Sequence, residues 1–578
     1  MKSRLVNIPT ALLVICFFVI IRVPVFAQSA KTFCNPVDLP YMFQPDGKYR
    51  SAADPAMVFY KNQYWLFVSK NDGYYVSDDL VKWKYIKGEG YPTEIFAPAV
   101  VVIHDKIYLT TGGGAGAGTF TTGNPASGIW TRVSNPDREL ADPATFLDDD
   151  GKLYLYDDCS DKNPIRVTQL DTAAFHSVSP VVDLFKGDPA MHGWEVPGDS
   201  NELKTKAPWI EGSWMNKING RYYLQYAAPG TQFSTYGDGV YVSDKPEGPF
   251  RYAPYSPFSF KPAGFITGSG HSSTFRDRDN NYWHVATLSI SVRHMFERRL
   301  GLFPAGVLSD GQLVTNTYLG DYPQHAALQG KDGWKNNLAG WMLLSYNKPA
   351  TASSVLSDSF KIKNAFDENI RTWWSAASGK KGEWLQVDLQ KQCEVDAVQV
   401  NFADQDADVQ NGFIKDGYGY YVVASSDAKT WTTIINHRTN QRDAPHDYTQ
   451  LDKPVTARYI KIINEHSPAG AKFSLYDFRI FGKAPGKNPA PVSNIVARLN
   501  PKDNREATVS WKPVADADFY IVRYGIAPDK LWGNYQVYHS ATLNIRSLNV
   551  GVPYYFTVDA VNGHGITRSK QIKKILGY

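Results

Sequence analysis

Asp54-Pro-Ala-Met-Val-Phe-Tyr-Lys-Asn-Gln-Tyr-Trp-Leu-Phe-Val68 joins an acid-led apolar strand, a polar turn and an aromatic strand. Related stretches begin at Ala97-Pro-Ala, Asp142-Pro-Ala and Glu211-Gly-Ser, and more loosely at His271-Ser-Ser. Their first residues are 43, 45, 69 and 60 residues apart. About 45 residues is the length of one four-stranded propeller blade. The repeat therefore predicts five blades around a common axis.

The predicted fold class is all-β, with a five-bladed β-propeller over residues 28–322 followed by two β-sandwich domains. Strand signals separated by turns continue to the end of the chain, and long helical periodicity is absent. The long step after Asp142 contains an insertion over residues 188–206. Its distinctive side chains are His192, Trp194, Glu195 and Asn201. Such a loop either shapes a binding site or only extends the rim of the propeller, and the sequence does not decide between these two roles.

The composition argues against several classes of protein. Net charge is +4 over 578 residues, and no basic run or acidic tail occurs, so a nucleic-acid partner is not expected. Aromatic residues make up 14% of the chain, which suits β-rich folds and sugar-stacking surfaces. The cysteines are too few and too widely spaced for a disulfide scaffold or a zinc ribbon. A single bridge between Cys34 and Cys159 stays open.

Residues 1–27 have the pattern of a bacterial-type secretory signal peptide. Lys2 and Arg4 precede an apolar core over residues 11–21, and Val25-Phe-Ala27 offers a small-residue cleavage site. The apolar core is too short to cross a bilayer comfortably, although a retained anchor stays open. No other segment suggests a membrane span. The sequence therefore predicts export across the inner membrane to the periplasm or the exterior. We also expect the protein to be a monomer.

The chain changes character past residue 322. A connector over residues 323–339 leads to a domain over residues 340–483. Its landmarks, in order, are Asn347-Lys-Pro-Ala-Thr-Ala-Ser-Ser354, Ala365-Phe-Asp-Glu-Asn-Ile-Arg-Thr-Trp-Trp-Ser375 and Tyr476-Asp-Phe-Arg-Ile-Phe-Gly482. This order resembles the discoidin, or coagulation factor 5/8 type C, β-sandwich, and we refer to the segment as the discoidin-like domain.

A proline- and glycine-rich linker over residues 484–491 precedes the last domain, residues 492–578. There Ala507-Thr-Val-Ser-Trp511 and Tyr520-Ile-Val-Arg-Tyr524 lead to a strand that begins at Tyr554. This pattern resembles a fibronectin type III sandwich, with Tyr554 in the tyrosine-corner region. Such domains usually serve as spacers. We refer to this segment as the fibronectin-like domain.

The repeat also predicts where the reactive side chains lie. In a propeller the innermost strand of each blade lines the central channel, so equivalent positions on different blades form a ring. If the five opening residues are equivalent, the carboxyl groups of Asp54, Asp142 and Glu211 converge with the imidazole of His271. Neighbouring carboxylates raise each other's pKa, which separates one protonated acid from one ionised acid. That separation is what acid–base cleavage of a glycosidic bond requires.

Asp54-Pro-Ala, Asp142-Pro-Ala and Trp209-Ile-Glu211-Gly-Ser together resemble glycoside hydrolase family 43, whose members are five-bladed propellers. The resemblance implies hydrolysis with inversion, without a cofactor for the chemistry. It implies that Asp54 is the general base, that Glu211 is the general acid, and that Asp142 orients Glu211 and keeps its pKa raised. An inverting pair needs a gap of roughly 6.5–9.5 Å to admit a water. Glu195 and Glu202 in the insertion are rival acids.

The resemblance implies an oligo- or polysaccharide substrate of plant type and an α-L-arabinofuranosidase first. A β-xylosidase and a β-D-galactofuranosidase are close rivals. A protein of another class also stays open: a secreted carbohydrate-binding or adhesion protein whose propeller has lost catalysis. The acid trio argues against that alternative.

Several residues are expected to support the site. Phe96 would form an apolar wall for the bound sugar. Arg299 is the predicted substrate-binding arginine, although Arg293 and Arg298 are alternatives that the sequence does not separate. His271 would bind substrate, hold a calcium ion in the channel through water, or act only as a satisfied channel histidine.

A structural calcium ion is also expected in the discoidin-like domain. Asp367, Thr372 and Asp477 match positions that hold such an ion in sugar-binding relatives of that fold. Calcium prefers oxygen ligands, which these side chains and their backbone carbonyls supply.

Overall fold

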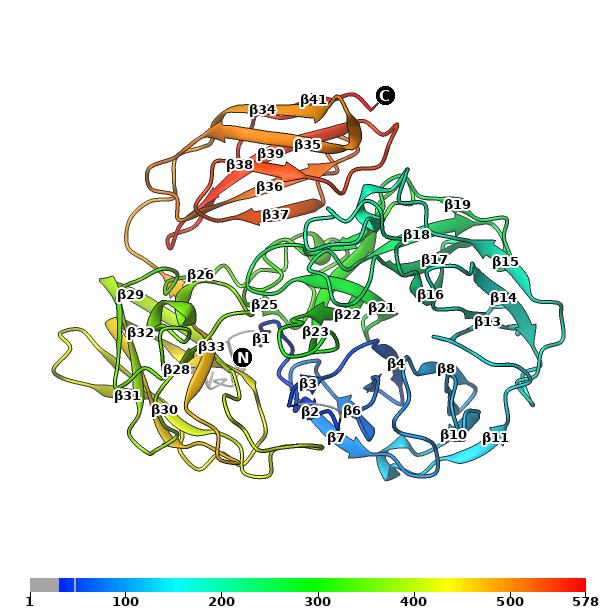
Figure 1. Cartoon of the computed structure of the whole chain (residues 1–578), viewed down its shortest axis with the longest axis horizontal. Helices are drawn as coiled ribbons and strands as arrows, with labels where there is room; N and C mark the ends of the chain where they lie inside the picture. The colour runs from blue at the N-terminus through cyan, green and yellow to red at the C-terminus, as the bar shows by residue number, and fades with distance from the viewer. Residues whose placement is uncertain (1–30, 46–47, 578) are drawn as a thin grey trace, which may run out of the picture.

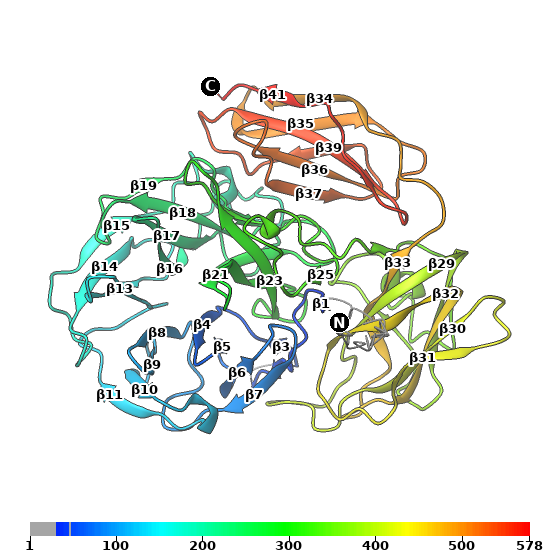
Figure 2. The same ribbon diagram turned by 180° about the vertical axis from the view of Figure 1, so that it is seen from behind.

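The structure is a computed structural model that describes residues 31–45 and 48–577. The predicted signal peptide, residues 1–27, lies outside the described residues. Regular structure in the described ranges is almost entirely β, and none of their helices is long and apolar enough to cross a membrane. Their helices are short 3-10 turns: η1 (Pro125–Ser127), η2 (Gly193–Glu195), η3 (Gly333–Lys335) and η4 (Ile362–Phe366). Figures 1 and 2 show a propeller with two further β domains packed beside it.

Five antiparallel sheets form the blades, which confirms the predicted fold class. Blade 1 comprises β4 (Ala56–Tyr60), β5 (Gln63–Phe67), β6 (Gly73–Ser77) and β7 (Trp83–Lys87). Blade 2 comprises β8 (Ala99–Ile103), β9 (Lys106–Thr110), β10 (Thr119–Thr122) and β11 (Thr131–Ser134). Blade 3 comprises β12 (Ala144–Leu147), β13 (Leu153–Asp157), β14 (Ile165–Leu170) and β15 (Val182–Phe185).

Blade 4 comprises β16 (Glu211–Ile218), β17 (Arg221–Ala228), β18 (Gly237–Ser243) and β19 (Arg251–Tyr252), with β20 (Ser259–Phe260) also paired to β18. Blade 5 comprises β21 (Gly268–Arg276), β22 (Tyr282–Ser289), β23 (Arg298–Val307) and β24 (Leu313–Thr315). Two short pairs precede and follow the blades: β1 (Thr32–Phe33) with β25 (Gln324–His325), and β2 (Met42–Phe43) with β3 (Arg50–Ser51).

The first strand of each blade faces the channel. Strands β4, β8, β12, β16 and β21 contact one another in a closed ring. Because each blade packs against two neighbours, both faces of its middle strands are apolar, as in the wholly buried run Leu-Tyr-Leu-Tyr-Asp of β13. Buried side chains of adjacent blades then form shared cores, such as that of Phe67, Tyr74, Val100 and Trp130 between blades 1 and 2.

A left-handed residue marks the same point in every blade, and it corrects the predicted register in blade 4. Asp54, Ala97, Asp142 and His271 have φ between 42° and 53°, and the corresponding residue of blade 4 is Gly212, with φ of 66°. Glu211 therefore lies one position earlier than the sequence pattern indicated. A β-bulge between Glu211 and Trp214 supplies the extra residue.

The discoidin-like domain contains one antiparallel set of eight strands around a large apolar core. They are β26 (Met342–Leu343), β27 (Ala350–Ala352), β28 (Trp374–Ser375), β29 (Trp384–Phe402), β30 (Gly419–Ser425), β31 (Thr432–His437), β32 (His446–His466) and β33 (Ser474–Lys483). The long strands β29 and β32 carry register shifts that bend them.

The fibronectin-like domain packs two sheets around Trp511, Tyr524 and Phe556. One sheet contains β34 (Ser493–Asn500), β35 (Asp503–Lys512) and β38 (Thr542–Ile545). The other contains β36 (Phe519–Gly525), β37 (Gly533–Val537), β39 (Tyr554–Val561), β40 (Ile566–Thr567) and β41 (Lys573–Ile575). The Tyr554 hydroxyl accepts the backbone N–H of Asn549 at 3.0 Å.

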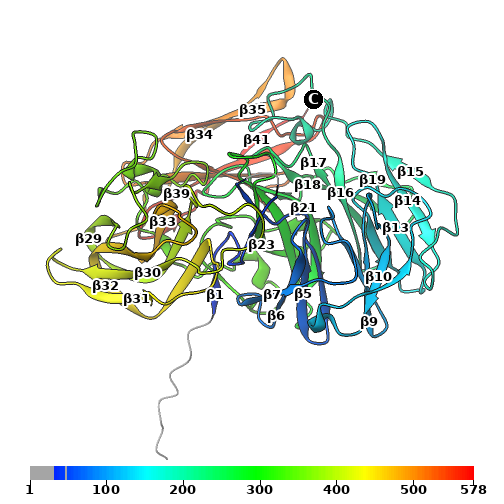
Figure 3. The same ribbon diagram turned by 60° about the horizontal axis from the view of Figure 1, so that its bottom comes forward.

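The insertion over residues 188–206 docks the fibronectin-like domain, so neither of its two predicted roles describes it. The Gly193 backbone N–H donates to Leu548 O at 2.9 Å, and Val550 N–H donates to Met191 O at 2.8 Å. Lys204 forms ion pairs with Asp503 and Glu506. Figure 3 shows this domain seated over the propeller rim.

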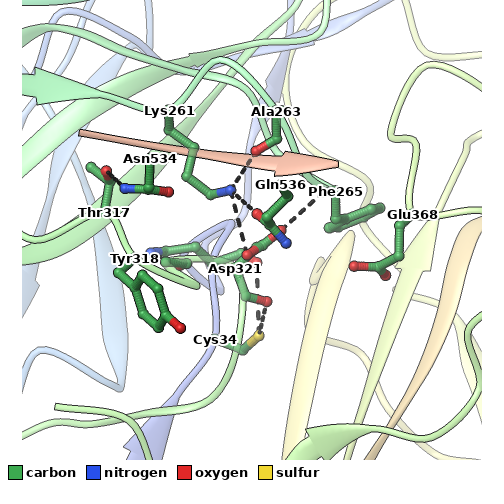
Figure 4. A network of polar contacts seen from close by, with 12 residues as sticks. Cys34, Lys261, Ala263, Phe265, Thr317, Tyr318, Asp321, Glu368, Asn534 and Gln536 are labelled. Atoms are coloured by element: carbon green, nitrogen blue, oxygen red, sulfur yellow. Dashed lines mark hydrogen bonds and ion pairs between the residues drawn. The ribbon is translucent and has the colours of Figure 1, made fainter. Parts of the chain in front are cut away.

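All three domains meet at a buried polar network (Figure 4). The Lys261 ammonium of the propeller lies 3.5 Å from Asp321 and donates to Gln536 of the fibronectin-like domain. The backbone carbonyl of Asp321 accepts from the thiol of Cys34 at 3.2 Å and from Arg479 of the discoidin-like domain. These groups are almost fully buried, and separating the domains would break the hydrogen bonds that Lys261 and Arg479 donate across the domain boundaries.

Candidate active site

A cavity of about 590 Å³ lies where the innermost strands begin. Every blade contributes to its lining, and in blades 1, 3 and 5 the left-handed residue at the start of the innermost strand is itself part of the wall. The residues that bear on the chemistry are Asp54, Phe96, Asp142, Cys159, Trp209, Glu211, His271, Met295, Phe296 and Arg298. The structure thus brings together the three predicted acids, the predicted wall residue and the predicted histidine.

Asp54 lies in an environment that keeps its carboxylate ionised. Arg298 Nη1 donates to Oδ1 at 3.1 Å, and the Ser69 hydroxyl donates to Oδ2 at 2.5 Å. Burial alone would raise the pKa of Asp54, but Arg298, His271 and the Ser69 hydrogen bond outweigh it and lower the pKa. Ser69 also accepts the Ala97 backbone N–H at 2.7 Å, which ties the strand starts of blades 1 and 2 to this carboxylate.

Asp142 and Glu211 form a second, contrasting arrangement around Cys159. The Cys159 thiol donates to Glu211 Oε2 at 3.2 Å and accepts the Trp209 indole N–H at 2.9 Å. The other oxygen of Glu211 accepts the Tyr236 hydroxyl at 2.5 Å. Burial and the negative charges of Glu211 and Asp54 raise the pKa of Asp142 to about 7, against the influence of His271.

His271 lies between the Asp54 carboxylate and the pair formed by Asp142 and Glu211. Its Nδ1 atom is 3.4 Å from Asp54 Oδ1 and 3.7 Å from Asp142 Oδ2. Burial opposes its protonation, but Asp54, Asp142 and Glu211 outweigh burial and raise its pKa. The imidazole thus lies among the acids and lines the cavity. A water-held calcium ion beside it stays a prediction.

One grouping in the described part of the chain has the geometry to hold a metal ion directly. The potential ligand atoms of Asp142, Cys159 and Glu211 lie within 4.8 Å of one another. All three belong to the cavity already described.

Aromatic and aliphatic side chains form the outer walls of the cavity. Phe96 is 41% exposed and Trp209 is 42% exposed, which leaves both rings open to a ligand. The rings of Phe96 and Phe296 lie 5.8 Å apart at a tilt of 56°, and Met295 continues this wall. Apolar faces around a few acids are the combination that sugar rings need, since a sugar presents C–H faces and a rim of hydroxyls.

Arg298, and not the predicted Arg299, reaches the cavity. Successive residues of a strand point to opposite faces, so only one of the two can face the channel. Arg299 is 1% exposed, donates to His446 at 2.8 Å and donates to the carbonyl of Arg50 at 2.8 Å. Arg293 turns toward the discoidin-like domain and lines no part of the cavity.

The rival acids lie outside the cavity. Glu195 is a fully buried residue of the insertion, where it accepts from Tyr226 at 2.5 Å and contacts His192 at 2.9 Å. Glu202 accepts the Ser200 backbone N–H within the same insertion. Cys34 and Cys159 are free thiols, so the bridge that the sequence left open does not form.

Cys159, Tyr236 and Ser69 were missed by the sequence reasoning. Trp209 stands two residues before Glu211 in the quoted motif, and that spacing was a signal for it. Cys159 belongs to none of the repeated motifs and lies just after β13, the second strand of blade 3. Its role is visible only once blades 3 and 4 are placed side by side.

The three residues of the predicted calcium site in the discoidin-like domain also lie near one another. Thr372 donates its hydroxyl to Asp367 Oδ2 at 2.7 Å, and Asp477 Oδ2 accepts the Glu368 backbone N–H at 3.1 Å. Arg479 is paired with Glu368 through two 2.8 Å bonds, so neither aspartate has an arginine of its own. Buried carboxylates without a dedicated cation fit a calcium ion, which stays a prediction.

Three family models match the chain in order. Glycosyl hydrolases family 43 matches residues 49–306, the F5/8 type C domain matches residues 349–477, and the fibronectin type III domain matches residues 490–575. A β-D-galactofuranosidase of Aspergillus niger is 25% identical over 269 residues, which cover 40% of this chain and 72% of that protein.

An arabinoxylan arabinofuranohydrolase of Paenibacillus polymyxa is 27% identical over 307 residues, which cover 42% of this chain and 46% of that protein. The chain thus spans less than half the length of this relative. A solved structure titled "Glycoside hydrolase" is 17% identical, with 76% of this chain and 99% of that chain covered and a TM-score of 0.44. The family match over the propeller, with its three acids in one cavity, shows that residues 49–306 form a glycosyl hydrolases family 43 domain, which is followed by F5/8 type C and fibronectin type III domains.

Proposed function

We propose that this glycoside hydrolase is secreted and inverts configuration, and that it removes terminal or side-chain sugars from a plant-type polysaccharide. An α-L-arabinofuranoside is the first candidate substrate. The observation that supports the mechanism is the contrast between two acid environments in one cavity. Asp54 is held ionised by Arg298, whereas the neighbouring pair Asp142 and Glu211 includes a carboxyl with a raised pKa of about 7.

In this proposal Asp54 accepts a proton from the attacking water. A general base must be ionised at the working pH, and the lowered pKa of Asp54 meets that condition. Arg298 and Ser69 each occupy one side of the carboxylate, which fixes its orientation. The water would attack the anomeric carbon from the face opposite the leaving group, which gives inversion in one step.

Glu211 donates its proton to the glycosidic oxygen in the same step. Its carboxyl is held between the Tyr236 hydroxyl and the Cys159 thiol, so its orientation is fixed before a substrate enters. One carboxylate oxygen of Asp142 and one of Glu211 lie within 4.8 Å of each other and of the Cys159 sulfur. Asp142 therefore serves in this proposal as the residue that orients Glu211 and modulates its acidity.

The sugar itself is proposed from the walls and from the relatives. Exposed Phe96 and Trp209 flank the acids and suit stacking on a small sugar ring. The relatives are named as acting on β-D-galactofuranosides and on arabinoxylan. A β-D-galactofuranosidase and a β-xylosidase are the alternatives, because the same acids serve any of these sugars.

A screen of aryl glycosides of arabinofuranose, galactofuranose and xylose tests the proposal. We expect release of the aryl group from one of them, with loss of that release in Asp54→Asn and with loss of cleavage of the corresponding oligosaccharide in Glu211→Gln. Glu202→Gln is the matched control, because Glu202 is an acid outside the cavity. Proton NMR of the first-formed sugar should show the inverted anomer. A retained anomer would contradict inversion, and sugar binding without cleavage would favour a carbohydrate-binding protein.

Export to the periplasm or the exterior is proposed from the pattern of residues 1–27 and from the two extracellular-type domains. Cell fractionation of a host that expresses the full chain checks it. Activity that remains in the cytoplasm would contradict this part of the proposal.

A further inference from the structure

The segment between β22 and β23, residues 290–297, builds one wall of the active-site cavity, and we call it the wall loop. Met295 and Phe296 line the cavity from this segment. The Phe296 ring lies 4.9 Å from the Arg298 guanidinium carbon, and Arg298 donates to Asp54. A displacement of the wall loop would therefore move both a sugar-facing surface and the support of the proposed base.

The wall loop is anchored at its base by Glu297, which is fully buried. Its Oε2 atom accepts the backbone N–H of Arg293 at 2.8 Å and that of Val292 at 3.2 Å. Its Oε1 atom accepts Arg293 Nη1 at 2.8 Å. The Glu297 carboxylate thus links the end of the wall loop to Val292 and Arg293. Because this carboxylate is fully buried, further hydrogen bonds to it help to offset the water that it has lost.

Those further partners come from the discoidin-like domain. The Tyr476 hydroxyl donates to Glu297 Oε1 at 3.0 Å and accepts a hydrogen bond from Arg293. Arg293 Nη2 donates to the carbonyl of Ala403 at 2.5 Å, and the guanidinium lies 4.8 Å above the Trp373 ring. None of these three partner residues lines the cavity.

We propose that Tyr476 of the discoidin-like domain is a positioning residue for substrate binding, because it holds the wall loop through Arg293 and Glu297. On this view the discoidin-like domain is a structural part of the active site, whether or not it binds sugar itself. The effect on substrate binding rests on the proposed function. The contacts of Tyr476 with Glu297 and Arg293, which we call the clamp, do not depend on that function.

The Tyr476→Phe variant tests the inference, since it removes only the hydroxyl that bonds to both Arg293 and Glu297. We expect KM for the cleaved aryl glycoside to rise about tenfold, the change expected from loss of one hydrogen bond to a charged group, with kcat changed less than about twofold. A merely structural role would lower the melting temperature and leave KM unchanged. Tyr459→Phe is the matched control, because Tyr459 is a half-buried tyrosine of β32 that lies outside the cavity.

Hydrogen exchange gives a second readout that needs no substrate. Faster exchange of the Val292 and Arg293 amides in Tyr476→Phe than in Tyr459→Phe is expected, because both amides donate to Glu297. Unchanged exchange would overturn the clamp. Faster exchange with an unchanged KM would overturn its role in substrate binding. If the unsubstituted protein cleaves none of the glycosides, the proposed function fails and the exchange measurement still decides the clamp.

Discussion

Gly212 packs directly against the ring of His271. A Cβ atom at position 212 would lie 2.8 Å from Cγ of His271, closer than non-bonded carbon atoms approach. Gly212 also has φ of 66°, which side-chain-bearing residues rarely adopt. The glycine that follows the proposed acid Glu211 therefore makes room for the imidazole that lies beside Asp54 and Asp142.

Gly212→Ala should lower kcat/KM by about a hundredfold or more, because displaced catalytic groups commonly cost that much. The displaced imidazole would no longer lie between the acids. Gly220→Ala is the matched control, since Gly220 has φ of 79° and a Cβ there would meet nothing within 4 Å. Both variants should lose a similar stability, about 1 kcal/mol, from the backbone conformation alone. Equal kcat/KM in the two variants would contradict the role of the Gly212–His271 contact.

Arg298→Gln should move the acidic limb of the pH profile of kcat/KM to higher pH. Arg298 is the foremost group that lowers the pKa of Asp54 against burial, so its removal raises that pKa. The base must be ionised to act, and a higher pKa then requires a higher pH. Arg299→Gln is the comparison, because Arg299 faces away from the cavity. An unshifted acidic limb in Arg298→Gln would contradict the assignment of that limb to Asp54.

Asp142→Asn should change how stability depends on pH. The folded pKa of Asp142, about 7, lies above its ordinary value near 4, so the folded protein binds the proton more tightly than the unfolded chain. Asp142 therefore contributes stability at acidic pH that is lost as pH rises toward 7. Relative to the unsubstituted protein, Asp142→Asn should gain in melting temperature between pH 5 and about 7. A constant difference across that interval would contradict the raised pKa.

The repeat was enough to predict the propeller, because five related strands, four of them led by an acid or a histidine, recur at steps of 43 to 69 residues and leave few other arrangements. It also predicted which acids converge. It did not predict the true register of blade 4, because the sequence pattern aligns Glu211 with Asp142. In the structure Gly212, with its positive φ, takes that position, and a bulge places Glu211 one residue earlier. The choice of Arg298 over Arg299 depended on strand phase, which one residue reverses.

Other parts of the site lay beyond any local pattern. Cys159 contacts Glu211 from a different blade, and Tyr476 supports the wall loop from a different domain. Such contacts depend on how separate sheets pack, and no spacing within the sequence encodes them. The insertion was predicted as a feature of the site or the rim because its partner, the fibronectin-like domain, is distant in sequence.

Chelation should reveal the calcium ion that we propose for the discoidin-like domain. Asp367 and Asp477 are carboxylates with raised pKa, caused first by burial, and a bound divalent ion would offset their mutual repulsion. We expect EDTA to lower the melting temperature of the unsubstituted protein and excess calcium to restore it. Asp477→Asn should respond weakly to either treatment. A melting temperature that EDTA leaves unchanged would contradict a calcium ion at this site.

The activity lost in Glu211→Ala should increase with the basicity of the leaving group. A general acid matters most when the departing oxygen is strongly basic, because that oxygen cannot leave without a proton. We expect a loss of about 10²- to 10⁴-fold on an oligosaccharide and a much smaller loss on a dinitrophenyl glycoside, whose leaving group departs unprotonated. Asp54→Ala should lose activity on both substrates alike, because attack by water is needed in either case. Equal losses for Glu211→Ala on the two substrates would remove Glu211 from the role of general acid and leave it only as a binding residue.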